Sequence, residues 1–281
     1  MIRLATRLAV AGSLLRASSL GAQAGAADTV VVEQRVLLAG EMTQADARRR
    51  AIEGALAEAV RRVTGVHVQS QILATKEERN GIVRDEFVSV VQLDAGGRAV
   101  GYDVLRDEWV TTKHPELGPQ LYYLVALRVA VARDVGVADA GFRVSLTVNN
   151  DVLRARSRPT DGDELVATVS ASERAAVTLI SIADDSARVL FPNDYVPMVT
   201  VDSAPSELPA AEWRARGLRL RPALPTGTDE RRELLLAVAT RSGVAPFRGG
   251  TVLELQRWLA SIRLDKRALS YAVVNVRRAE R

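Results

Sequence analysis

The stretch that decides the fold is Ala175–Asn193, which reads Ala-Ala-Val-Thr-Leu-Ile-Ser-Ile-Ala, then Asp-Asp-Ser-Ala, then Arg-Val-Leu-Phe-Pro-Asn. Its first part is rich in β-branched and apolar residues, which is typical of a strand. Asp184–Ser186 has the short polar side chains of a turn. Pro192 ends the second strand because it cannot donate a ladder hydrogen bond. The pattern predicts the central hairpin of a β-rich domain.

Short strands separated by Gly, Pro and Asp surround this hairpin, the pattern of an antiparallel β-sandwich. We expect them at Phe142–Val148, Glu164–Ser170, Met198–Val201, Arg219–Arg221 and Glu233–Thr240, followed by an amphipathic helix at Thr251–Leu264 and a strand at Tyr271–Val276. Residues 140–281 are therefore predicted to form a β-sandwich-like domain with a C-terminal helix and strand. Phe191 is expected to fill the space between the two sheets.

Three motifs in this region resemble a bacterial domain of unknown function found on exported proteins. They are Gly162-Asp163 before a strand, Leu190-Phe-Pro-Asn193 after an apolar strand, and Pro225-Thr-Gly-Thr228 before the apolar strand Leu234–Val238. The resemblance covers about residues 142–245. It implies an exported protein and no catalysis, because that family has no established activity.

The region before Asp134 predicts a strand at Thr29–Leu38, a helix that begins after Thr43, and two long strands at Val100–Thr111 and Leu121–Arg133. Apolar residues alternate along the second long strand and fall on one side of it: Tyr123, Val125, Leu127, Val129 and Val131. Thr43 is a good N-cap, and Gly65 is expected to end the helix. An apolar face of mostly alanine predicts close packing of the helix on a sheet. A short strand at Val66–Ser70 is also expected. Lys76–Val91 fits a helix, while Val83–Leu93 fits an extended segment equally well. Residues 28–136 thus predict a mixed domain with one long helix on an antiparallel sheet, which makes the whole chain α+β.

The segment from Thr43 to Ser70, with its regular alanines and its Gly-Val turn into a strand, resembles the N-terminal domain of the flagellar assembly protein T family. The resemblance covers roughly residues 29–133 and implies a periplasmic α+β domain.

Residues 1–26 resemble a secretory signal, with Arg3 and Arg7 before an apolar run and small residues at its end. Cleavage fits after Ala24 or Ala26, and an organelle transit peptide is the alternative. No later run is long enough to span a bilayer as a helix. We expect a periplasmic or secreted protein without a transmembrane segment after signal removal.

The composition excludes several classes of function. The chain has no Cys, which excludes disulfides and thiolate chemistry. The net charge of +4 falls to +1 without Arg3, Arg7 and Arg16, and aromatic residues are only 4% of the chain. Neither feature fits a nucleic-acid-binding protein.

No motif for catalysis or cofactor binding is present. His67 and His114 are the only histidines and have no ligand or base partner nearby in sequence. Asp161–Glu164 and the Asp184-Asp185 pair fit turns better than calcium loops. The sequence therefore predicts a protein that is not an enzyme and has no metal or cofactor.

Basic residues are concentrated at the C-terminal end, where nine Lys and Arg from residue 241 onward face three acidic residues, for a net +6. As possible contacts for an acidic partner or an anionic surface we single out Arg257, Arg263, Lys266, Arg267, Arg277 and Arg278. A solvated helix face and tail is the alternative.

Together these patterns predict a non-catalytic envelope protein that acts as a binding or assembly module, with another envelope protein as its partner. The alternatives are a periplasmic sensor or carrier of a small ligand and a polyanion-binding or envelope-surface module. A pocket lined by Tyr195, Trp213 or Trp258 would favour the small-ligand function.

Overall fold

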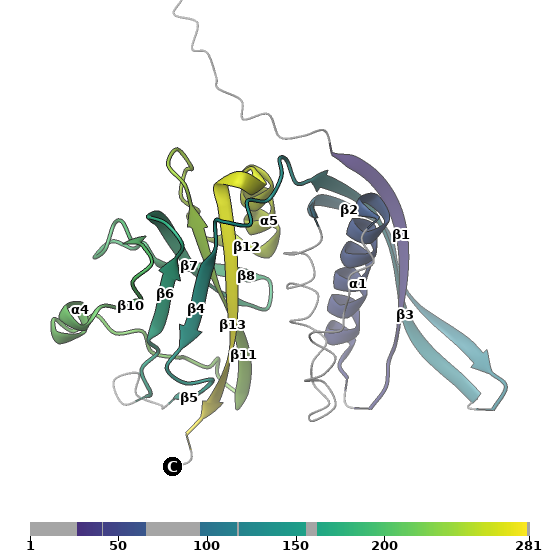
Figure 1. The fold of residues 1–281 in the computed structure, drawn as a ribbon. Helices are drawn as coiled ribbons and strands as arrows, with labels where there is room; N and C mark the ends of the chain where they lie inside the picture. Colours follow the sequence, from purple (N-terminus) through teal and green to yellow (C-terminus); the bar gives the residue numbers. More distant parts are fainter. Residues whose placement is uncertain (1–26, 41, 66–95, 117, 156–161, 280–281) are drawn as a thin grey trace, which may run out of the picture.

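The computed structural model describes residues 27–40, 42–65, 96–116, 118–155 and 162–279. The structure contains both helices and antiparallel sheets, with about 49% of residues in strands, which is compatible with the predicted α+β class. One sheet is built from residues 28–133 and two more from residues 144–278. The long helix α1 lies between the first sheet and the rest of the molecule (Figure 1).

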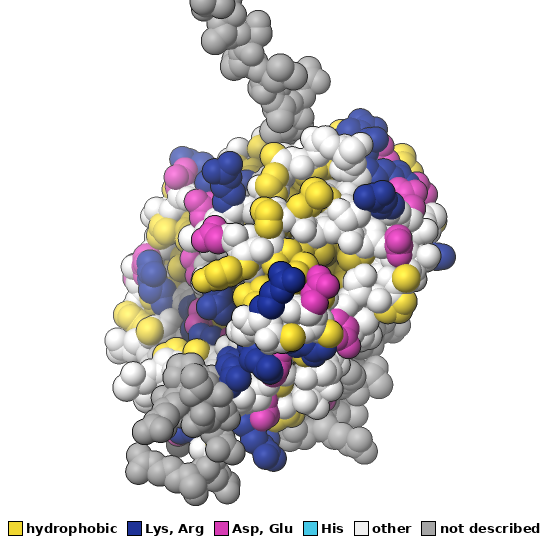
Figure 2. Space-filling view, turned by 90° about the vertical axis from the view of Figure 1, so that its left-hand side faces the viewer, with side chains coloured by type: hydrophobic (Ala, Val, Ile, Leu, Met, Phe, Trp, Pro, Cys, Tyr) yellow, Lys and Arg dark blue, Asp and Glu magenta, His cyan; other side chains and the backbone are white. Residues whose placement is uncertain are grey.

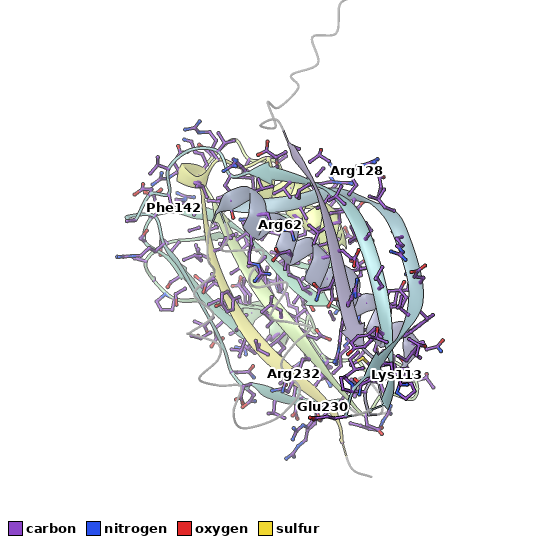
Figure 3. All side chains as sticks on the ribbon, turned by 90° about the vertical axis from the view of Figure 1, so that its right-hand side faces the viewer. Arg62, Lys113, Arg128, Phe142, Glu230 and Arg232 are labelled. Carbon is purple, nitrogen blue, oxygen red and sulfur yellow. The ribbon has the colours of Figure 1, made fainter. Side chains whose placement is uncertain are left out.

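The first sheet has the order β1-β3-β2 and is antiparallel throughout. Its strands are β1 (Asp28–Leu37), β2 (Gly97–His114) and β3 (Gly118–Arg133). As the alternating apolar residues of β3 predict, every second side chain from Tyr123 to Val131 is buried against α1. Lys113, close to the β2–β3 turn, and Arg128 on β3 lie along the outer part of this sheet (Figure 3).

Helix α1 (Gln44–Thr64) begins and ends as the sequence predicts. Thr43 and Asp46 form a reciprocal capping box, and Gly65 ends the helix with a φ of 69°. The alanine face packs on the sheet, since its small side chains let the helix backbone approach closely. Its fully buried members are Ala47, Ala51, Ala55, Ala59 and Val60.

Residues 144–278 form a seven-stranded sheet of order β12-β8-β7-β11-β13-β5, with β9 beside β7, and a three-stranded sheet of order β10-β6-β4. The strands are β4 (Val144–Val148), β5 (Val152–Ala155), β6 (Ala167–Ala171), β7 (Ala175–Ala183), β8 (Ser186–Phe191), β9 (Thr200–Val201), β10 (Ser206–Leu208), β11 (Glu230–Thr240), β12 (Gly250–Thr251) and β13 (Arg267–Arg278). Helices α4 (Ala211–Ala215) and α5 (Val252–Ala260) and a short 3-10 helix, η2 (Leu264–Lys266), complete this part.

Side chains from both sheets form one core, for example Val169 of β6 and Leu179 of β7. This is compatible with the sandwich-like arrangement expected for residues 140–281. Phe191 belongs to this core and is fully buried. The other face of the larger sheet packs against α5, where Leu255 and Leu259 are buried.

Several details differ from the sequence prediction. The antiparallel pattern has an exception, because β13 pairs with β5 in parallel. Strands β5, β10 and β12 and helix α4 were not predicted, since each is five residues or fewer and too short for a periodic signal. Arg219–Arg221 contributes only an isolated bridge at Leu220, and His114 is the last residue of β2 instead of a loop residue.

Some expectations fall outside the described residues. These are the signal segment at residues 1–26, the strand at Val66–Ser70 with His67, and the alternative elements within residues 76–93. Among the helices that the structure does describe, none combines the length and apolar character needed to cross a membrane.

Candidate functional site

A buried group of charged side chains joins the two parts of the molecule. Arg98 of β2 donates from Nε and Nη2 to Asp134 at 3.2 and 3.3 Å, and from Nη1 to the Gln256 side chain of α5 at 3.1 Å. Nη2 of Arg267, the first residue of β13, lies 2.6 Å from Asp134 Oδ1. Arg267 also donates to the carbonyl oxygen of Leu259.

These side chains are almost completely enclosed, with Arg98 only 1% exposed and Arg267 6% exposed. Two cations share one carboxylate there, and the Gln256 amide oxygen and the Leu259 carbonyl oxygen each accept one further hydrogen bond from them. Arg257 adds a further link, since its Nε donates to the carbonyl oxygen of Val100 on β2. We call Arg98, Asp134, Gln256 and Arg267 the junction cluster; its contacts hold β2, α5 and the start of β13 together.

The six C-terminal cations singled out from the sequence do not share one surface. Arg267 is buried in the junction cluster, so the expectation that it contacts a partner is corrected. Arg257 faces β2, and Arg263 pairs with Asp265 at 2.9 Å. Three others are exposed: Arg277 pairs with Glu230, Arg278 pairs with Asp229, and Lys266 lies in η2.

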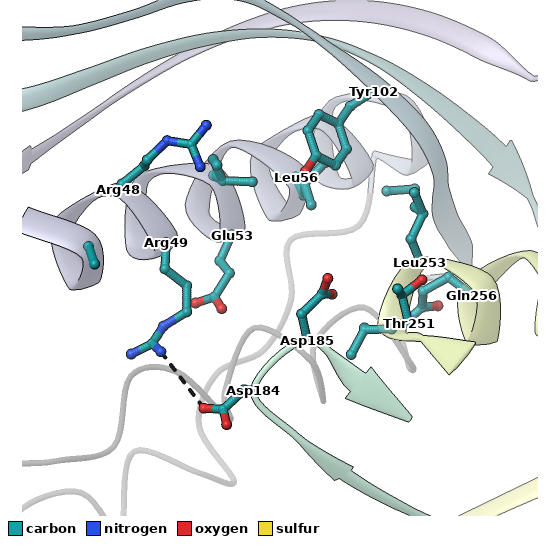
Figure 4. A pocket seen from close by; sticks show the side chains of 14 residues that line it. Arg48, Arg49, Glu53, Leu56, Tyr102, Asp184, Asp185, Thr251, Leu253 and Gln256 are labelled. Carbon is teal, nitrogen blue, oxygen red and sulfur yellow. Dashed lines mark ion pairs between the residues drawn. The ribbon is translucent and has the colours of Figure 1, made fainter. Parts of the chain in front are cut away.

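A cavity of about 420 Å³ lies next to the junction cluster, between α1, β2, the β7–β8 turn and the start of α5 (Figure 4). Its floor is apolar and includes Ile52, Leu56 and Leu253. Five charged side chains line it: Arg48, Arg49, Glu53, Asp184 and Asp185. We call it the junction cavity.

The arginines of the junction cavity already have partners in this chain. Arg48 donates to Asp107 at 3.0 Å and to the Tyr123 hydroxyl at 3.1 Å. Arg49 pairs with Asp46 at 2.9 Å and lies 3.8 Å from Asp184.

The carboxyl of Asp185 lies at the rim of the same cavity. Partial burial raises the pKa of Asp185 above its usual value, because the charged carboxylate loses contact with water. The hydrogen bond from the Val252 amide lowers this pKa, and the nearby negative charge of Glu254 raises it further. Because Arg48 and Arg49 pair with other side chains of this chain, they stabilise the packing of α1 and leave little positive charge in the junction cavity for a ligand.

A second site is built by the loop that follows β8. Asn193 fixes this loop, because its side chain donates to the Leu190 carbonyl at 2.9 Å and accepts from the amides of Tyr195 and Val196 at 3.0 Å each. An Asn used in this way makes a rigid turn. The result is an ordered loop from which Tyr195 and Met198 project, with 82% and 72% of their surface exposed.

A cavity of about 480 Å³ adjoins this loop, and we call it the Tyr195 cavity. Its lining comes from the loop, from α4 and from the turn after α4: Tyr195, Val196, Trp213, Arg216, Gly217, Leu218 and Arg219. The Trp213 ring stacks on Phe191 with a centroid distance of 6.1 Å and an interplanar angle of 23°. The core therefore supports one wall of the cavity directly.

The charges on the Tyr195 cavity are all positive. Arg219 pairs with Glu164, which lies outside the lining. Arg216 is exposed and forms no ion pair with any residue that the structure describes. The face that carries α4 and the smaller sheet also gathers hydrophobic side chains around a hollow near its centre (Figure 2). Apolar surface beside an unpaired cation, Arg216, is suited to binding.

Of the three aromatic residues that the sequence connects with a pocket, Tyr195 and Trp213 line this cavity. Trp258 lies elsewhere, where it packs on Phe247 and donates to the Ala245 carbonyl at 2.8 Å. No local sequence pattern marks Arg216, Leu218 or Arg219 as site residues. Their position after α4 gave no signal, because α4 is only five residues long.

Among the residues that the structure describes, neither cavity carries a recognisable catalytic arrangement. Over the described ranges, no three His, Cys, Asp or Glu side chains come close enough together to hold a metal ion. Asp163 has a structural role in the segment before β6, since its side chain accepts a hydrogen bond from the Arg154 amide of β5 at 2.9 Å. The arrangement supports binding and offers no nucleophile with a paired base.

No family model, curated protein or solved structure matches this chain. The two family resemblances drawn from the sequence therefore stay predictions.

Proposed function

We propose that this protein is a non-catalytic binding or assembly module of the cell envelope that holds a partner protein at the Tyr195 cavity. The observation that carries the proposal is the ordered display of Tyr195 and Met198 to solvent beside that cavity. Exposed apolar surface that is rimmed by polar residues marks a candidate interaction site. Tyrosine beside a well-formed pocket is also a frequent centre of binding energy.

The rigidity of the loop favours binding of a protein. Asn193 makes three side-chain hydrogen bonds within the loop, so little conformational entropy remains to be lost when a partner binds. Export to the periplasm is part of the proposal and is supported by the Arg-then-apolar start of the chain and its Ala-x-Ala sites.

A sensor or carrier of a small ligand is the second candidate function. It is favoured by the presence of both Tyr195 and Trp213 in the lining of one cavity. The volume of about 480 Å³ is within the range of small-molecule sites, roughly 300–1,000 Å³.

The test of the proposed function compares partners retained by the mature protein and by a Tyr195→Ala/Met198→Ala double variant. Both proteins are immobilised and exposed to envelope extract, and retained proteins are identified by mass spectrometry. We expect at least one envelope protein to be retained by the wild type and lost from the double variant. Both side chains are exposed, so the thermal midpoint should not change.

Val137→Ala is the matched control, because Val137 is 83% exposed but lies in the segment between β3 and β4. This variant should retain the same proteins as the wild type. If the double variant also retained the same set, the Tyr195 cavity would not be the binding surface and the proposal would be wrong.

A further inference from the structure

We infer that the segment recognised at the Tyr195 cavity is acidic and aromatic: a side chain with an aromatic ring enters the cavity, and a neighbouring carboxylate pairs with Arg216. This inference rests on the proposed function and specifies the chemistry of the partner.

The walls of the cavity favour a ring. Trp213 and Tyr195 supply aromatic surface, and Val196 and Leu218 supply aliphatic surface. Aromatic side chains gain from offset or edge contacts with other rings in addition to the burial of apolar area. Stacking of Trp213 on Phe191 holds its ring in place before a ligand arrives.

The charged residues of the lining determine which side chain of the bound segment can lie next to that ring. Among the described residues of the lining, the only charged ones are Arg216 and Arg219, so a Lys or Arg at the same place in a ligand would be repelled. Glu164 partly neutralises Arg219. Arg216 is therefore the cation available to a carboxylate, since it is exposed and forms no ion pair within the described residues. Glu212, the acid nearest to Arg216 in sequence, and Asp194, next to Tyr195, do not line the cavity.

The surroundings of the cavity favour a segment of a protein chain over a free aromatic acid. Met198 is 72% exposed but does not line the cavity, although it belongs to the same loop as Tyr195. A small molecule inside the cavity would leave Met198 in water. A peptide continues past the cavity and can cover this side chain with its flanking residues.

The experiment selects a phage-displayed library of random heptapeptides on the full mature protein and, in parallel, on an Arg216→Glu variant. We expect wild-type selections to be enriched in Asp or Glu next to Phe, Tyr or Trp. The variant should lose that enrichment and favour Lys or Arg next to the ring. Arg216 has no ion pair to lose, so an unchanged thermal midpoint checks that the variant is folded.

A single selected peptide then gives the size of the effect. Its affinity for Arg216→Glu should be lower by about two- to five-fold, which is the ratio expected for the loss of one solvent-exposed charge pair. Arg188→Glu is the control, because Arg188 is also exposed but lies on β8 outside the cavity lining. It should leave the affinity unchanged.

Three results would overturn the inference: no enrichment of acidic aromatic peptides, the same enrichment on Arg216→Glu, or displacement of the peptide by phenylacetate with equal affinity. The last result would make the site one for small aromatic acids. Failure of the inference is distinguishable from failure of the proposed function. If retention of envelope proteins depends on Tyr195 and Met198 but not on Arg216, the function stands and the inferred chemistry is wrong.

Discussion

Arginine has opposite roles in the junction cluster and at the Tyr195 cavity. At the junction, Arg98 and Arg267 are buried beside Asp134 and donate hydrogen bonds within the same chain. At the Tyr195 cavity, Arg216 and two large apolar side chains face solvent. A buried charge without a partner is costly, so the junction arginines are structural; exposed groups cost little and are free for recognition.

The largest loss of stability is expected when the junction cluster is disrupted. Asp134→Ala removes the carboxylate shared by Arg98 and Arg267 and leaves two buried cations uncompensated. We expect a loss of about 3–5 kcal/mol in the free energy of unfolding, measured by urea denaturation. Glu230→Gln, which breaks the exposed pair with Arg277, should cost less than about 1 kcal/mol. Equal losses in the two variants would contradict the contrast between buried and exposed charge.

A similar loss is expected in the core beneath the Tyr195 cavity. Phe191→Ala leaves a void between the sheets and removes the ring on which Trp213 stacks, so it should cost about 3–5 kcal/mol. Chemical denaturation measures this value. A loss below about 1 kcal/mol would show that Phe191 is not part of the core. Peptide binding should weaken as well, because the Trp213 wall loses its support.

A smaller effect is expected at the start of α1, which carries the residues of the junction cavity. Thr43→Ala removes the N-cap and should cost about 1 kcal/mol. The Thr43 hydroxyl also donates to Asp46 at 2.6 Å and lowers the pKa of that carboxyl below its usual value.

This second contact makes the effect of Thr43→Ala depend on pH. The carboxylate form of Asp46 is the one stabilised by folding, so its contribution is present above about pH 4 and is lost as the pH falls through the folded pKa. The difference in stability between wild type and Thr43→Ala should therefore shrink in acid. Gln44→Ala, at the first helical position, should show no such pH dependence. A difference that grew in acid would contradict the assigned hydrogen bond.

The smallest expected effect on stability is at the Tyr195 cavity itself. Tyr195→Ala should change the free energy of unfolding by no more than about 0.5 kcal/mol, because the side chain is almost fully solvated. Thermal or chemical denaturation tests this. A loss of 2 kcal/mol or more, on the order seen for buried side chains, would show that Tyr195 packs in the fold and is not held ready for a partner.

The sequence alone determined the local elements of this protein. Alternating apolar residues predicted β3, the Asp184–Ser186 turn predicted the central hairpin, and Thr43 and Gly65 predicted the ends of α1. These features depend on residues that are close in sequence, where periodicity and backbone preferences act directly.

Only the tertiary structure decided which charges are buried and which side chains form a site. Arg267 and Arg277 look alike in the basic C-terminal segment, yet one meets Asp134 inside the molecule and the other meets Glu230 at the surface. Trp213 lines a cavity with Tyr195 because α4 packs beside the loop after β8. Such contacts join residues far apart in the chain, and their energy depends on solvent exclusion, which no local pattern encodes.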